Sequence, residues 1–200
     1  MMASLYRAGV FAGRSLGAMR FGGLLGYTQG DVTYGMARRS VRVLSLQSRV
    51  SRDFALPYGN LLTPLLSLDA QRVRVGSAAE SDPFLGLQVP QQNVNEVSSL
   101  AALREVHAWQ WRQLHGNLSA SLGVLHWWRR PPTSLVLGFN AIPGVSFTNW
   151  GVAAPRNVLE GSLGMHARLR KNLTAQVAYQ GDLGRKLRVN EIEVHLIWNF

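Results

Sequence analysis

The side chains best suited to chemistry are scattered along this sequence and do not form a recognisable site. Five histidines are present, but none has a second metal-binding side chain at the spacing that ligand pairs use. Serine, histidine and aspartate all occur, yet no nucleophile elbow or other local signature of hydrolysis is found. Cysteine is absent, which removes thiolate catalysis and thiolate metal sites. We therefore predict no catalytic residue, no metal site, no cofactor and no enzymatic activity. The histidines are His107, His115, His126, His166 and His195.

Basic residues dominate the charge without forming a patch. The formal net charge is +10, from 21 Lys and Arg against 11 Asp and Glu. Phosphate tracking needs basic side chains gathered on one face, so we do not expect a nucleic-acid partner. Arg168 and Arg170 are two residues apart and would point the same way from a strand. They either line an electropositive interior or are two solvated charges near a turn.

The last thirteen residues alternate with a period of two. Apolar side chains hold one parity, whereas Glu191, Glu193 and His195 hold the other. This pattern predicts a β-strand that ends on an aromatic residue. The apolar residues of this strand are Ile192, Val194, Leu196, Trp198 and Phe200.

The same alternation recurs along the chain. It predicts strands over 159–169, 172–180, 117–124, 19–28 and 62–71, with tight connections at 170–172 and 181–184. Segments 37–52 and 95–111 alternate poorly and are expected to be strands from their spacing. We expect about ten strands joined as hairpins, with longer links at 28–36, 75–94 and 140–156.

The alternation along the chain predicts an all-β protein, and composition limits how it could meet a membrane. Apolar residues make up 46% of the chain, charged residues only 16%, and no apolar run is long enough for a transmembrane helix. Alternating strands can form a soluble barrel or sandwich with the apolar parity inward, or a membrane barrel with it outward. The charged members of the polar parity favour the membrane barrel, where they would face the lumen. These candidates are Arg20, Arg42, Glu160, His166, Arg168 and Arg170.

Aromatic residues cluster at the expected strand ends, as an interfacial girdle requires. Trp127 and Trp128 are followed directly by two arginines and two prolines. A strand that leaves a bilayer is expected to show aromatic, then basic, then turn residues in this order. A strand that stops at an aromatic residue also fits a barrel whose last strand pairs with another to leave no open edge. The candidate girdle residues are Tyr27, Trp109, Trp111, Trp127, Trp128, Trp150 and Tyr179.

Several segments resemble the translocator domain of autotransporters. Bacterial outer-membrane proteins commonly end on Phe after alternating apolar residues, and the terminal strand is similar to that arrangement. The segments 147–157 and 172–184 resemble the family's third strand from the end and the strand that follows it. The stretches 5–14 and 16–28 are similar to the family's early hairpin. The resemblance is strongest after residue 113.

This resemblance implies one antiparallel up-and-down transmembrane β-barrel domain over residues 1–200. The expected function is to anchor a passenger polypeptide and help its export across the bacterial outer membrane. The implied partners are outer-membrane lipid, the barrel-insertion machinery, which would read the terminal strand, and the chain's own passenger. The family barrel has about twelve strands, so we expect the first strands, the linker helix, the passenger and the signal peptide to be missing here. The alternatives are a porin-like channel and a soluble β-rich binding protein.

Overall fold

The computed structural model describes residues 2–34, 37–80, 86–112, 114–142, 144–151, 153, 155–185 and 187–198. Apart from the short 3-10 turn η1 (Pro57–Gly59), the regular structure of these residues consists of strands. One large sheet contains β1 (Met2–Leu16), β2 (Met19–Tyr34), β3 (Ala37–Arg52), β4 (Phe54–Ala55), β5 (Asn60–Val75), β8 (Gln92–Trp111), β9 (Leu114–Arg129), β12 (Asn157–Arg170), β13 (Leu173–Gly184) and β14 (Leu187–Trp198). The remaining strands form a small second sheet: β6 (Ala78–Ala79), β7 (Leu87–Val89), β10 (Ser134–Phe139) and β11 (Ser146–Trp150).

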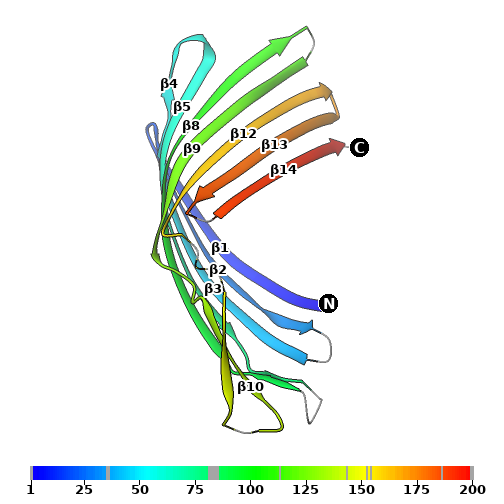
Figure 1. Ribbon diagram of the computed structural model, residues 1–200. Coiled ribbons are helices and arrows are strands. Elements are labelled where there is room, and N and C mark those ends of the chain that lie inside the picture. The colour runs from blue at the N-terminus through cyan, green and yellow to red at the C-terminus, as the bar shows by residue number, and fades with distance from the viewer. Residues whose placement is uncertain are drawn as a thin grey trace.

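The large sheet has ten strands, as the alternation predicts, and nine of them follow one another in chain order. Each strand pairs antiparallel with the next, and the two-residue β4 pairs only with β5. Figure 1 shows a strongly twisted and curved layer, with β1 and β14 at its free edges. Among the described residues, no pairing joins β1 to β14.

The two ends of the sheet differ in their connections. At the short-turn end, tight turns join β1 to β2, β8 to β9 and β12 to β13. Gly17 makes the first of these turns possible, because its φ of 60° lies in the left-handed region that other residues avoid. At the long-link end, segments 76–91 and 130–156 join β5 to β8 and β9 to β12.

The small sheet corrects two expectations about the links. Segments 75–94 and 140–156 were expected to be links between strands, but they contribute β6, β7 and β11, which combine with β10 in the order β11-β10-β7-β6. In Figure 1 this sheet, marked by β10, extends beyond one end of the large sheet. The expected link at 28–36 is also wrong, because β2 continues to Tyr34 and pairs with both β1 and β3.

A single layer leaves little interior. Only four hydrophobic side chains of the described residues are buried: Leu65, Leu137, Val158 and Ala167. In water, most of the apolar area of such a sheet would stay hydrated, which removes the main driving force for folding. The fold therefore needs an apolar medium on one face.

No helix among the described residues is long and apolar enough to cross a membrane.

Candidate functional site

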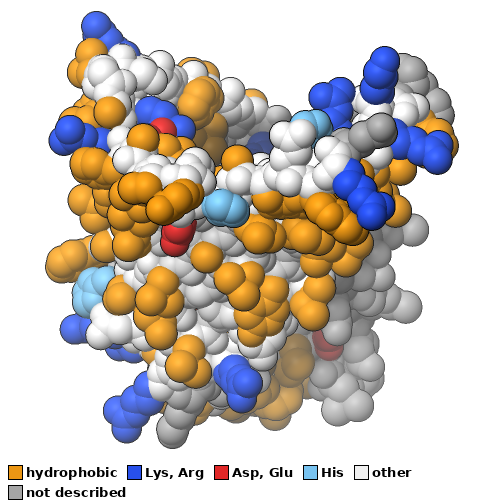
Figure 2. All heavy atoms as spheres, turned by 90° about the horizontal axis from the view of Figure 1, so that it is seen from above, with side chains coloured by type: hydrophobic (Ala, Val, Ile, Leu, Met, Phe, Trp, Pro, Cys, Tyr) orange, Lys and Arg blue, Asp and Glu red, His pale blue; other side chains and the backbone are white. Residues whose placement is uncertain are grey.

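The candidate site is the large sheet itself, whose two faces have opposite chemistry. The register aligns apolar side chains into rows that cross the strands, and these rows define the apolar face. One such row runs through Leu66, Ala101, Val124, Leu159 and Leu183 on β5, β8, β9, β12 and β13. Figure 2 shows hydrophobic side chains spread over the surface seen from above, with Lys and Arg mostly toward its margins.

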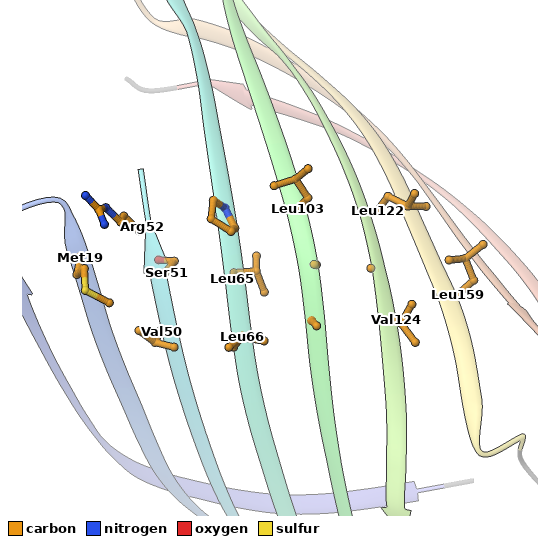
Figure 3. A pocket seen from close by; sticks show the side chains of 14 residues that line it. Met19, Val50, Ser51, Arg52, Leu65, Leu66, Leu103, Leu122, Val124 and Leu159 are labelled. Carbon is orange, nitrogen blue, oxygen red and sulfur yellow. The ribbon is translucent and has the colours of Figure 1, made fainter. Parts of the chain in front are cut away.

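Apolar residues on this face are exposed although they lie in the middle of the sheet. Leu122 is 60% exposed and Leu163 is 61% exposed. A hollow of about 640 Å³ opens where the small side chain of Ala101 lies between leucines. Figure 3 shows Leu66, Leu103, Leu122, Val124 and Leu159 along neighbouring strands at this hollow. Such a surface can contact hydrocarbon but offers few hydrogen-bond partners.

The opposite side is the polar face. Its rows include Thr63, Arg104, Ser121, Ser162 and Gln180, which are aligned across five strands by the register. The Ser121 and Ser162 hydroxyls are hydrogen-bonded at 2.7 Å. Thr63, only 5% exposed, donates a 2.8 Å hydrogen bond to Asp53. This face can therefore contact water or a polar chain.

Four of the six predicted interior residues lie on the polar face. Arg20 lies opposite Ser51 and forms an ion pair with Asp53. Glu160, His166 and Arg168 lie on the polar parity of β12, opposite Asp182, Gln176 and Thr174. Their contact with a water-filled lumen stays a prediction.

The other two predicted interior residues are placed differently. Arg42 pairs with Gln29 and Arg74, and so lies on the parity of Leu44 and Leu46, not on the polar face. In this part of β3 the polar-face positions carry valines, so the sequence pattern does not show which face is polar. A β-bulge between Arg168 and Arg170 brings Arg170 opposite Leu173, so the two arginines do not keep a common register.

The predicted girdle aromatics divide in three ways. Trp109, Trp111 and Trp128 lie on the apolar-face parity near strand ends, and the Trp128 indole N–H donates to Ser99 at 3.0 Å. Tyr27 and Tyr179 also lie on this parity but near the middle of β2 and β13. The expected position of Tyr27 at a strand end is wrong because β2 continues beyond residue 28.

The remaining two tryptophans lie elsewhere. Trp127 lies opposite the buried Ser98, on the polar parity, next to a bulge between Val97 and Ser98. Trp150 belongs to the small sheet and is 74% exposed. Whether any of the seven aromatics meets a membrane interface stays a prediction.

The terminal strand keeps its alternation in the structure. Ile192, Val194, Leu196 and Trp198 lie on the apolar face of β14, a free edge of the sheet, and each is at least 59% exposed. The backbone of this edge is free to pair with another strand. Phe200 lies outside the described residues.

Three charged residues of β3 and β8 were missed by the sequence analysis. Arg49 and Arg104 lie on the polar face, opposite Ser67 and Thr63. Glu105 is exposed on the apolar face, between Leu62 and Ala120. Arg49 alternates with Ser45, Gln47 and Ser51, and this pattern could have placed it on the polar face. Glu105 lies among apolar residues of its parity, so the pattern gives no signal for it. Among the described residues, no three His, Asp or Glu side chains are grouped closely enough to hold a metal ion.

One protein family matches most of this chain. A family model described as "Autotransporter beta-domain" matches residues 3–180. The crystal structure of the beta domain of the Bordetella autotransporter BrkA is similar, with 18% sequence identity and a TM-score of 0.38, over 99% of this chain and 91% of that one. No curated protein matches this chain.

Proposed function

This chain belongs to the family of autotransporter β-domains, and from that membership we propose that it anchors a passenger polypeptide in the outer membrane and helps it to cross. The family consists of outer-membrane β-barrel translocators of type V secretion, and this chain is one of them. The transport of a particular passenger is the step that the proposal adds.

The observation that carries the proposal is the contrast between the two faces. Leu122 is exposed on the apolar face, whereas the adjacent residue Ser121, on the polar face, is hydrogen-bonded to Ser162. A barrel that puts the apolar face outward satisfies hydrocarbon, and its polar face then lines a wet interior. An extended polypeptide could pass there with its backbone hydrated.

Two further partners belong to the same proposal. Lipid would cover the apolar face, including the hollow beside Ala101. The barrel-insertion machinery would read β14, because this strand combines alternating exposed apolar side chains with a free edge. The chain would act by binding and transport, without catalysis.

Export of a reporter tests the proposal. A signal peptide and an epitope-tagged segment are fused ahead of residue 1 and expressed in Gram-negative cells. We expect protease added to whole cells to remove the tag, because the segment has crossed the outer membrane. A tag that stays protected while the chain is folded in the outer membrane would contradict the proposal.

A matched pair of variants shows whether the faces have the assigned roles. Leu163→Asp puts a carboxylate on the apolar face, and Ser162→Asp puts one on the polar face of the same strand. We expect Leu163→Asp to remove most folded protein from the outer membrane. Ser162→Asp should leave the folded amount unchanged.

A further inference from the structure

The polar face holds a hollow with arginines around it. The hollow has a volume of about 770 Å³ and is bordered by β1, β2, β3, β5 and β8. Gly13 and Gly22, opposite each other on β1 and β2, leave space for the ring of Phe11, which lies over both and forms part of the lining. Arg20, Arg49 and Arg104 all line it.

Two of these guanidinium groups are available to a ligand. Arg20 pairs with Asp53. Arg49 and Arg104 are exposed, and within the described part of the chain neither guanidinium group has a hydrogen bond or ion pair. Arginine presents several N–H donors in a planar fork that fits a carboxylate. The chemistry of the hollow therefore selects a carboxylate.

Charged side chains are distributed unevenly across the polar face of the sheet. Beyond the hollow, the strands β12, β13 and β14 present acidic side chains on this face. Asp69 and Glu96 also lie on the polar parity of β5 and β8, but they do not line the hollow. A polypeptide next to this face would meet arginines at the hollow, and four carboxylates together with Arg168 on β12–β14. The acidic residues are Glu160, Asp182, Glu191 and Glu193.

We propose that this hollow binds acidic side chains of the polypeptide that the domain translocates. The inference rests on the proposed function and adds the chemical class of the segment: a polar stretch that carries Asp or Glu. The occupant is a polypeptide because the proposed function passes one along this face, and the Ser and Thr side chains around the hollow can hydrogen-bond its backbone. Arg49 and Arg104 bind its carboxylates and hold the segment toward β1–β8.

Peptide binding tests the inference directly. Fluorescent peptides of equal length, with repeating Asp-Ser, Asn-Ser or Lys-Ser, are titrated with the refolded chain in zwitterionic detergent, and anisotropy is recorded. We expect the Asp-Ser peptide to bind more tightly than the other two, and its binding to weaken as salt is added. In the Arg49→Gln/Arg104→Gln double variant, we expect binding to weaken about tenfold, as for the loss of two partly exposed ion pairs.

The control removes the same charge from the other face. Arg42→Gln/Arg72→Gln changes two arginines on the parity of Leu44, and we expect it to bind like the parent chain. Equal binding of the Asp-Ser and Asn-Ser peptides, or equal loss in both double variants, would overturn the inference.

The export assay separates this failure from failure of the proposed function. If the parent chain exports no reporter at all, the proposed function is wrong. If it exports acidic and neutral reporter segments equally, and the Arg49→Gln/Arg104→Gln variant does the same, only the inference about the hollow is wrong. We expect the acidic segment to be exported more efficiently, and that advantage to disappear in the double variant.

Discussion

At the scale of single residues, Glu105 carries a carboxylate on the face that meets hydrocarbon in this family's barrels. Trp109 lies four positions away toward the short-turn end. In the other direction along β8, Ser99 lies beside Trp128 and accepts a hydrogen bond from its indole N–H. Glu105 lies between these two aromatic levels, and within the described residues its carboxylate has no hydrogen bond or ion pair. Its ionised form should therefore cost folding free energy.

Replacing this carboxylate should stabilise the protein in lipid. We expect Glu105→Leu to raise the free energy of unfolding by about 1–2 kcal/mol, because the cost of a charge on the lipid side is removed. Urea unfolding in vesicles, followed by tryptophan fluorescence, measures the change. Glu193→Leu, on the polar face of β14, is the control and should give no gain. A loss of stability in Glu105→Leu would show that Glu105 has a stabilising partner.

Gly116 shows how a close contact between strands restricts a position. A Cβ at this residue would overlap the carbonyl oxygen of His166 and the ring of Trp109, so the backbone has to shift. We expect Gly116→Ala to lower the free energy of unfolding by about 1–3 kcal/mol. Gly161→Ala is the matched control, since the nearest atoms to its Cβ are 4.0 Å away. Equal stability of the two variants in urea unfolding would contradict this packing.

At the scale of the elements, the sequence predicted the C-terminal strands best. Strand 159–169 agrees with β12, and the described part of strand 188–200 agrees with β14, because each face has one chemistry. The tight connection predicted at 181–184 is wrong, because β13 continues to Gly184 and pairs there with both β12 and β14. The strand predicted over 37–52 is confirmed as β3, but the face of Arg42 within it was predicted wrongly. Val41 and Val43 of β3 lie on the polar parity, so the alternation of that strand is blurred. The end of β2 and the small sheet depend on pairing between distant segments, which alternation alone does not reveal.

The candidate site was predictable in part for the same reason. Arg20 and Glu160 follow a clear alternation and lie on the expected face. A bulge displaces Arg170, and bulges leave no sequence signal strong enough to predict. The hollow needs Arg20, Arg49 and Arg104 from three strands, so only the register brings them together.

The edge strand β14 allows a test of the apolar parity as an assembly signal. Val194 lies on the apolar face opposite Val177, and His195 lies on the polar face opposite Gln176. We expect Val194→Asp to reduce the folded chain in the outer membrane severalfold, because a carboxylate on the lipid side costs about 1–3 kcal/mol. His195→Asp should leave the amount nearly unchanged. Heat-modifiable mobility of outer-membrane fractions measures both. If both variants lose a similar amount of folded chain, the added carboxylate disturbs the edge strand whichever face it lies on.

At the scale of the whole molecule, strand direction limits how this sheet can close. The order from β1 to β14 contains nine strands, and every neighbouring pair is antiparallel. Eight reversals leave β1 and β14 running in the same direction. These nine strands could close on themselves only through a parallel pair, whereas single-chain bacterial barrels have an even number of strands and all-antiparallel pairs. An antiparallel barrel of this family therefore needs a further strand between β1 and β14, and refolded residues 1–200 on their own should keep two open edges.

Open edges in an apolar medium should make the isolated chain associate. Unpaired backbone groups cost several kcal/mol in hydrocarbon, so pairing with another copy is favoured over exposure. When residues 1–200 are refolded into detergent, we expect strand-type circular dichroism and sedimentation as oligomers whose size rises with protein concentration. In plain buffer we expect aggregation, since the apolar face has no cover. A heat-modifiable monomer at all concentrations would show that β1 and β14 do close in parallel, and a soluble monomer in buffer would show that the apolar face turns inward.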